Sequence, residues 1–194
     1  MPKDTKHLLR AEAVRLFAER GYSAVSMRDL AEAVGMRQGG IYNHFASKQA
    51  LLADLMAGHM QALLVALETA LPDQGSATER LAAFVRHHVT YHLDHPDDVF
   101  LAYMEIRSLE PENRVTIVAL RNTYESTLQD ILSEGAAREG FRIGDVAVHA
   151  RMLLSMMTGA TVWYREGGRL KRDEVVDCYL QGAMQSVGGE VELS

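Results

Sequence analysis

The side chains best suited to chemistry in this sequence are concentrated between Ser26 and Lys48, and the chemistry they suit is recognition of nucleic acid. Arg and Gln hydrogen-bond to base edges, while Lys, Tyr and His can contact phosphate oxygens. The candidate DNA contacts are Ser26, Arg28, Arg37, Gln38, Gly39, Gly40, Tyr42, Asn43, His44 and Lys48. The paired glycines would either bring bare backbone close to the DNA or leave a helix that orders only on binding.

Two short helices are needed to position these candidates. Ser26, followed three residues later by Asp29, is the pattern of a capped helix start. Apolar residues then recur at helical spacing, and Gly35 is suited to end the helix in the left-handed conformation. A second helix over about 37–44 would bury Ile41 and turn its polar side chains outward. Two such helices joined by a glycine-containing turn are a helix-turn-helix.

This stretch, with the helix before it, resembles the TetR family of transcriptional repressors. The resemblance lies in the segments LFAERGY (16–22), SMRDLAEAVGM (26–36), GGIYNHF (39–45) and SKQALL (47–52). It implies an all-α homodimer that binds a pseudo-palindromic DNA operator and is released by a small apolar effector. The chain departs from the family at Arg37, where Ser or Thr is usual, and at Gly40, where a hydroxyl residue or Ala is frequent.

The charge distribution agrees with a DNA-binding end. The 194 residues are 47% apolar and 24% charged, as in folded globular chains, and the net charge is −6. Residues 1–48 nevertheless hold eight Lys/Arg against five Asp/Glu, so this part is basic and the remainder is strongly acidic. We therefore expect a DNA-binding domain at 1–48 and a ligand-binding and dimerisation domain at 49–194.

The rest of the sequence predicts helices only, because apolar residues recur at helical rather than strand spacing. The fold class expected is all-α with about nine helices, and the helix of about 47–70 would connect the two domains. Single Cys178 allows no internal disulfide, and no secretory signal opens the chain. No apolar stretch approaches the ~20 residues that span a bilayer. These features predict a cytoplasmic protein with no membrane partner.

The last two long helices each have an apolar stripe, which in most proteins is intrachain core. One recognition helix, however, reads few base pairs, and a two-fold dimer places two readers about 34–36 Å apart. A four-helix bundle of these helices would hold such a dimer together, and the family resemblance implies the same interface. The predicted interface residues are Leu153, Met157, Ala160, Val176, Tyr179, Leu180, Ala183, Met184 and Val187.

A ligand pocket is predicted from methionine, aromatic, histidine and arginine side chains of the body. Methionines suit an adaptable apolar cavity, although they equally suit a helical core. The candidates are Met60, His88, Tyr91, His92, Tyr103, Met104, Arg107, Arg121, Tyr124, Met156, Trp163 and Arg165.

A second resemblance concerns the effector. The segments EIRSL (105–109), RNTYE (121–125) and WYREGGRL (163–170) are similar to the TetR branch that controls fatty-acid and steroid breakdown. That branch implies an acyl-CoA effector, whose phosphates would bind arginines. The alternative for Arg121 is an ion pair with Glu125 at i, i+4 spacing.

Two other functions stay open from the residues alone. His88 and His92, at i, i+4 spacing, could hold a metal ion if a third ligand completed the set, which would make a metal-responsive regulator. The chain could also be a helical ligand-binding protein whose N-terminal head, the predicted helix-turn-helix domain at 1–48, does not bind DNA. Arg37 and Gly39–Gly40 would favour this alternative. The sequence has no glycine-rich phosphate loop and no nucleophile–base motif, so we predict no enzyme activity, no cofactor and no resident metal.

Overall fold

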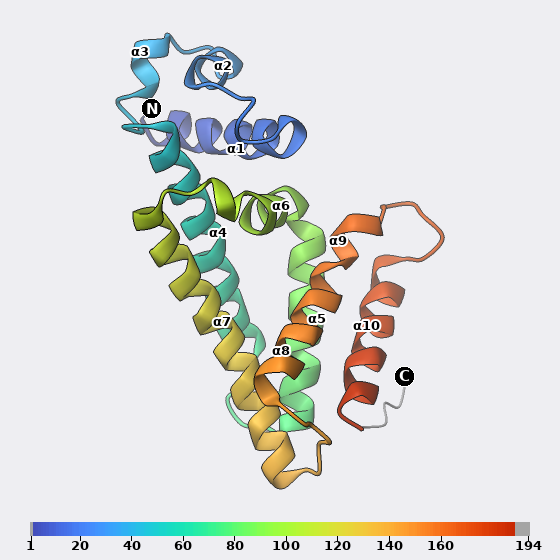
Figure 1. Cartoon of the computed structure of the whole chain (residues 1–194). Coiled ribbons are helices and arrows are strands. Elements are labelled where there is room, and N and C mark those ends of the chain that lie inside the picture. Colours follow the sequence, from blue (N-terminus) through green and yellow to red (C-terminus); the bar gives the residue numbers. More distant parts are fainter. Residues whose placement is uncertain (1, 189–194) are drawn as a thin grey trace. The chain divides into compact units, whose positions relative to one another are not determined.

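The computed structural model describes residues 2–188, and helices are the only regular secondary structure in these residues (Figure 1). They are α1 (Pro2–Arg20), α2 (Met27–Ala33), α3 (Gln38–Ile41), α4 (Lys48–Ala70), α5 (Ala77–Asp94), α6 (Pro96–Met104), the 3₁₀ helix η1 (Glu105–Ser108), α7 (Pro111–Arg138), α8 (Val146–Thr158), α9 (Ala160–Trp163) and α10 (Arg172–Ser186). The predicted all-α fold class is confirmed.

Two helical segments of the described residues are interrupted. The sequence predicts one helix over about 97–108, and this segment is α6 followed by the tighter turn η1, a common way for an α-helix to end. The sequence also predicts one helix over about 145–166, but α8 stops at Thr158 and Gly159 separates it from the single turn α9. Glycine has a low helix propensity, which is consistent with an interruption at this position.

Local capping explains where several helices begin. The Ser76 hydroxyl accepts from the Glu79 backbone N–H at 3.1 Å, and the Glu79 carboxylate accepts from the Ser76 N–H at 2.8 Å. Asp145 caps α8 by accepting from the Val148 N–H at 2.8 Å. These bonds satisfy backbone donors that lack partners within the helix, so the starts of α5 and α8 were predictable from sequence.

The chain divides into two compact units, which are described separately below. Unit 1 comprises Met1–Ala62 and Pro96–Leu120, and unit 2 comprises Leu63–His95 and Arg121–Ser194. Unit 1 is therefore larger than the DNA-binding domain predicted at 1–48. Residues 96–120 belong to it because α1 packs on α6, and Leu101, Leu109 and Ile117 share its apolar core. The predicted boundary at residue 48 marks the end of the helix-turn-helix sequence motif, whereas unit 1 is defined by which helices pack together.

The core of unit 1 is formed by the inward faces of α1, α2 and the first half of α4, together with α6. Its most buried large side chains include Leu9, Phe17, Leu30, Ile41 and Leu52. Ile41 is fully buried, so the single turn α3 is attached to the rest of the head by this side chain. The core thus orients the short segment that carries the predicted DNA contacts.

In unit 2, α5 packs against α8, α9 and α10, and Figure 1 shows α5, α8 and α10 running side by side. Phe84 and Val85 of α5, Leu153 and Met157 of α8, and Leu180 of α10 are buried in this core. Four polar side chains of the described chain are also buried, and two of them, His88 and His92, belong to α5.

Helix α4 is long and apolar enough to cross a membrane by length and composition alone. The expectation that no apolar stretch approaches this length is corrected here. The same property arises in a core helix of a folded protein, where apolar side chains face other helices. Leu51, Leu52, Leu55 and Met56 of α4 are at most 3% exposed, so this part of the helix has its apolar face in the core of unit 1.

Candidate nucleic-acid interface and effector site

The helix-turn-helix begins with a capped α2. The Ser26 N–H donates to the Asp29 carboxylate at 2.8 Å, and the Ser26 hydroxyl accepts from the Asp29 N–H at 3.2 Å. Gly35 ends the helix at φ +67°, in the left-handed region that glycine adopts without strain. The Met36 N–H then bonds to the Ala31 carbonyl at 2.8 Å, completing a hydrogen-bonded helix stop that directs the chain into α3.

Helix α3 is shorter than predicted. Its α-helical part is the single turn Gln38–Ile41, and Tyr42–His44 continue as a tight turn in which the His44 N–H bonds to the Ile41 carbonyl at 3.0 Å. The N-cap residue Arg37 makes no side-chain cap hydrogen bond. An arginine has no acceptor for this role, and two glycines follow it within the turn, so both departures from the family pattern weaken this helix.

Most of the predicted DNA contacts lie at the surface of the head. Arg28, Arg37, Gly39, Tyr42 and Asn43 are exposed. Ser26 is exposed but its hydroxyl is engaged in the α2 cap. Gly40 and His44 are half-buried, and Gln38 lies in α3 with its side chain outside the described part. The exposed residues lie in α2, at the start of α3, within it and in the turn after it, and they leave two arginines and a tyrosine available to a DNA duplex.

Lys48 occupies a more enclosed position than a phosphate contact requires. Its ammonium lies 4.0 Å from the centroid of the Tyr22 ring and 5.9 Å from that of Phe17. Burial lowers the pKa of Lys48, and Glu105 and Asp29 partly oppose this shift. The observed geometry is a cation above an aromatic face, which stabilises the start of α4. A phosphate contact by Lys48 stays a prediction.

A buried polar cluster in unit 2 contains three of the predicted ligand residues. The two ring nitrogens of His88 are hydrogen-bonded to the Tyr124 hydroxyl and the Thr158 hydroxyl, each at 3.1 Å. The His92 ring stacks on the His88 ring with 3.7 Å between centroids. We call His88, His92, Tyr124 and Thr158 the His88 cluster. It joins α5, α7 and α8 within a core that is otherwise apolar.

The environment of the His88 cluster favours neutral imidazole. Burial lowers the pKa of His88 well below its ordinary value, and the neighbouring His92 and His87 rings add to the effect. Neutral His88 can donate through one nitrogen and accept through the other, which matches its two hydroxyl partners. Thr158 was not among the predicted ligand residues, because the local sequence around one threonine in an apolar helix does not indicate which distant histidine it will contact.

The other predicted ligand residues of unit 2 do not all gather at this cluster. Tyr91 lies edge-on to His92 with 6.4 Å between ring centroids, and Arg121 is half-buried. Met156, Trp163 and Arg165 are exposed instead, and the Trp163 indole stacks on Tyr179. These three residues lie on outward-facing parts of α8, α9 and the loop that follows, and their role in binding a ligand stays a prediction.

Four predicted ligand residues belong to unit 1. Met60 is buried in α4, whereas Tyr103 and Met104 of α6 and Arg107 of η1 are exposed. Their role in binding a ligand stays a prediction.

The predicted dimer residues occupy the inward faces of α8–α10 rather than a surface. Eight of the nine are at most 5% exposed within the protomer: Leu153, Met157, Ala160, Val176, Leu180, Ala183, Met184 and Val187. Only Tyr179 is more accessible. Side chains that already pack in one protomer offer little surface to a second, and the role of these residues in a dimer interface stays a prediction.

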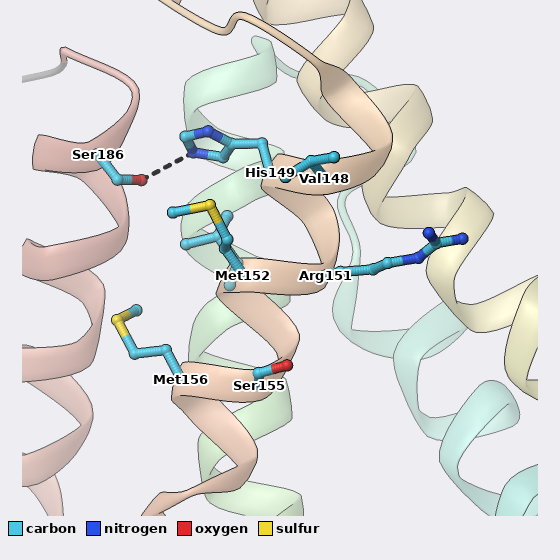
Figure 2. A pocket seen from close by; sticks show the side chains of 8 residues that line it. Val148, His149, Arg151, Met152, Ser155, Met156 and Ser186 are labelled. Atoms are coloured by element: carbon cyan, nitrogen blue, oxygen red, sulfur yellow. Dashed lines mark hydrogen bonds between the residues drawn. The ribbon is translucent and has the colours of Figure 1, made fainter.

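The outward face of α8 carries different apolar residues. Val148, Met152 and Met156 are 53%, 61% and 40% exposed, and they line a groove of about 540 Å³ that reaches Ser186 of α10. Figure 2 shows Met152 and Met156 pointing towards α10, with His149 hydrogen-bonded to Ser186 at 3.0 Å. Arg151 points away from the groove and its guanidinium pairs with Glu125 at 2.9 Å. Exposed apolar side chains in a row are typical of an interaction surface.

Two known protein families match different parts of the chain. Residues 9–55 match the family described as bacterial regulatory proteins, tetR family, and residues 74–187 match the tetracyclin repressor-like, C-terminal domain. This chain belongs to the TetR family. It is accordingly a DNA-binding, ligand-responsive transcriptional regulator, and members of the TetR family are not enzymes.

Individual TetR relatives align over most of the chain. The HTH-type transcriptional repressor KstR2 of Rhodococcus jostii (strain RHA1) is 30% identical over 172 residues, which cover 87% of this chain and 83% of that protein. The TetR family transcriptional regulator PfmR from Thermus thermophilus has 33% identity and a TM-score of 0.82, covering 95% of this chain and 99% of PfmR. AibR, solved in complex with isovaleryl coenzyme A and operator DNA, has 26% identity and a TM-score of 0.85 over 92% of this chain and 97% of AibR.

The geometry gives no support to the metal-responsive alternative within the TetR family. Both ring nitrogens of His88 are already hydrogen-bonded, so binding a metal would require one of these bonds to break. Among residues 2–188 there is also no group of three His, Cys, Asp or Glu side chains that could hold a metal ion. A structural or catalytic metal site ordinarily needs at least three protein ligands.

Proposed function

We propose that this chain is a homodimeric repressor that binds a pseudo-palindromic operator and releases it when a small effector with an apolar part binds. The observation that carries the proposal is the exposure of Arg28 on α2 and of Arg37 and Tyr42 at the two ends of α3, on a capped helix-turn-helix of a TetR-family chain. The cytoplasm, where operator DNA is accessible, is the proposed location. The exposed surface also argues against a head that has lost DNA binding.

The dimer interface proposed from the structure is the outward face of α8 with the adjoining part of α10. Its Val148, Met152 and Met156 side chains expose apolar surface that a second copy would cover. A two-fold arrangement of α8 and α10 from each copy would make a four-helix bundle. Such a dimer would present two α3 segments to successive major grooves about 34–36 Å apart.

An acyl-CoA thioester is the effector we propose to test first. Support comes from AibR, whose structure contains isovaleryl coenzyme A, and from the similarity of three segments to regulators of fatty-acid and steroid breakdown. The exposed Arg165 of unit 2 is a candidate for binding the CoA phosphates.

Operator binding is tested by selecting genomic DNA fragments with the pure protein and titrating the recovered site by fluorescence anisotropy at several salt concentrations. Arg37→Ala should weaken binding and relax the preference at one base position, whereas Lys48→Ala would weaken all sequences alike if that side chain contacts phosphate. Arg142→Ala, which changes an exposed arginine of unit 2, is the matched control. A protein that stays monomeric and prefers no DNA over random duplex would contradict the proposal.

The effector is tested by calorimetry with a series of acyl-CoAs against the free acids and free CoA. A ligand that shifts the DNA-bound state from 99:1 to 1:99 has to prefer the released state by about 5.5 kcal/mol. We expect one thioester to release the operator and Arg165→Ala to weaken the binding of that thioester. If no thioester binds but another apolar compound does, the acyl-CoA assignment fails while the repressor assignment remains.

A further inference from the structure

A second hydrogen-bonded cluster, in unit 1, is centred on Gln49, which was not among the predicted site residues. The Gln49 amide nitrogen donates to the Tyr22 hydroxyl at 2.9 Å and to the Ser108 carbonyl at 2.6 Å. The Gln49 amide oxygen accepts from the Glu110 backbone N–H at 3.0 Å. One side chain therefore connects three segments: the α1–α2 link, the first turn of α4 and the η1–α7 link.

Glu105 holds the same tyrosine from its other end. Its carboxylate accepts from the Tyr22 backbone N–H at 3.0 Å and from the Ser108 hydroxyl at 2.6 Å. Tyr22 is thus bound at its amide and at its hydroxyl by two residues that are distant in sequence. We call Tyr22, Gln49, Glu105 and Ser108 the Gln49 cluster.

The Gln49 cluster lies where both ends of the DNA-reading segment leave the core of the head. Tyr22 follows Gly21, whose φ of +81° makes the turn at the end of α1, and it packs edge-on against Phe17 at 5.2 Å between centroids. Lys48, at the start of α4, places its ammonium 4.0 Å from the centroid of the same tyrosine ring. The α2–α3 segment is therefore anchored at Tyr22 on its N-terminal side and at Lys48 and Gln49 on its C-terminal side.

We propose that Gln49 and Glu105 are positioning residues for operator recognition: by fixing Tyr22 and the start of α4 to the η1–α7 link, they set the orientation of α2 and α3. This inference rests on the proposed function, since it concerns how the operator is read. Neither residue is among the proposed DNA contacts. Removing their hydrogen bonds should lower the affinity for the operator without removing any contact to phosphate.

The first test compares Gln49→Ala with Gln61→Ala, which changes an exposed glutamine elsewhere on α4. We expect Gln49→Ala to weaken operator binding about fivefold, the order of effect of one or two ordinary hydrogen bonds. Its affinity for random duplex and the slope of log K against log salt should match the wild type, because the number of neutralised phosphates is unchanged. Gln61→Ala should change neither property.

Tyr22→Phe is the second variant, since it removes only the hydroxyl and keeps the ring beneath Lys48. It should weaken operator binding in the same direction, and the Tyr22→Phe/Gln49→Ala double variant should lose less than the sum of the two single effects. Thermal unfolding checks that each variant is folded. If Gln49→Ala does not fold, the decision rests on Tyr22→Phe alone.

The inference is overturned if the wild type prefers its operator and neither variant loses affinity. It is also overturned if the slope of log K against log salt for Gln49→Ala decreases by the amount that corresponds to about one lost phosphate contact. The proposed function fails in a different way, through a wild type that shows no preference for any operator. The two failures are therefore distinguishable in the same titrations.

Discussion

The His88 cluster and the Gln49 cluster connect segments in the same manner but in different environments. Each uses one central side chain to hydrogen-bond partners that are distant in sequence: two for His88 and three for Gln49. His88 is 1% exposed between Tyr124 and Thr158, whereas Gln49 and Tyr22 are half-buried. Water can replace a lost bond in the Gln49 cluster, but it cannot readily do so around His88. The first cluster should therefore contribute mainly to folding, and the second mainly to how the head is oriented.

The two clusters also differ in charge: the Gln49 cluster includes charged groups, whereas the His88 cluster is neutral. The Gln49 cluster contains the Glu105 carboxylate and adjoins the Lys48 ammonium, and both groups retain partial access to solvent. The His88 cluster holds a neutral imidazole, because a buried charge without a compensating partner is strongly unfavourable. The comparison makes four predictions, which follow from the largest expected effect to the smallest.

The largest difference should appear on deleting the central side chains. His88→Ala should lower the free energy of unfolding by about 2–4 kcal/mol, because it leaves a cavity and removes the ring that satisfies two hydroxyls. Gln49→Ala should cost about 1 kcal/mol or less, since water can reach its partners. Urea unfolding of both variants makes the measurement, with half-buried His149→Ala as control. Equal losses at His88 and Gln49 would remove the distinction between the clusters.

A near-isosteric change isolates one hydrogen bond of the buried cluster. Thr158→Val keeps the side-chain shape but withdraws the hydroxyl from the His88 ring, and it should lower the free energy of unfolding by about 1–2 kcal/mol. Thr69→Val is the matched control, because Thr69 is exposed and bonds only to a carbonyl of its own helix. The control should change stability by less than about 0.5 kcal/mol. A similar loss of unfolding free energy in both variants would show that the buried Thr158 hydroxyl contributes no more to stability than the exposed Thr69 hydroxyl.

The neutral state of His88 predicts a pH dependence of folding. Its folded-state pKa is lowered far below the unfolded value near 6.5, so the stabilisation is present above about pH 6.5 and is lost as the pH falls below it. Below about pH 6.5 the His88 imidazole binds a proton in the unfolded chain but stays neutral in the folded chain. The free energy of unfolding should fall by up to about 1.4 kcal/mol per pH unit from this residue.

The pH prediction is measured as the stability difference between the wild type and His88→Gln in urea at pH 7.5 and pH 5.5. Taking the difference cancels carboxylates that titrate alike in both proteins, and the two proteins should converge at the lower pH. His149, whose pKa burial also lowers, provides the comparison variant His149→Gln. A difference that is independent of pH would mean that His88 does not remain neutral in the fold.

The smallest effect is expected at the DNA-reading surface of unit 1. A Cβ added at Gly39 would meet no atom within 4 Å, and the same is true of Gly182 in α10. Both Gly39→Ala and Gly182→Ala should stabilise folding by about 0.5–1 kcal/mol. If bare backbone at Gly39 lies against DNA, only Gly39→Ala will lose operator affinity in anisotropy titrations. Unchanged or improved affinity would favour a reading segment that orders on binding.

Local sequence signals predicted the helix boundaries that depend on near neighbours. Ser26 with Asp29 caps α2 as expected, and Ser76 and Asp145 cap α5 and α8 in the same local way, because cap and backbone donor are three residues apart. Gly35 adopts the predicted left-handed conformation for the same local reason. Helix α3 is shorter than the predicted 37–44, because Arg37 supplies no side-chain cap and two glycines within the turn have low helix propensity.

Periodicity identified apolar faces but not their partners. The stripe through Leu153 and Met157 packs inside unit 2, while Met152 and Met156, one position earlier along the same helix, face the groove. Both sets have identical i, i+4 spacing, so the sequence contains no sign of which one meets a neighbouring helix and which one meets solvent. That choice depends on the packing of α8 against α5.

The amino-acid sequence by itself determined the all-α class, the TetR-family head with its basic charge, and the start of most helices, because these features depend on residues within one or two helical turns. Tertiary structure alone decided that Thr158 and Tyr124 would meet His88, and that Gln49 would meet Tyr22 and the η1–α7 link. Those partners lie between 27 and 70 positions apart along the chain. Such contacts form only when whole helices pack, and no local pattern encodes which side chains will then face each other.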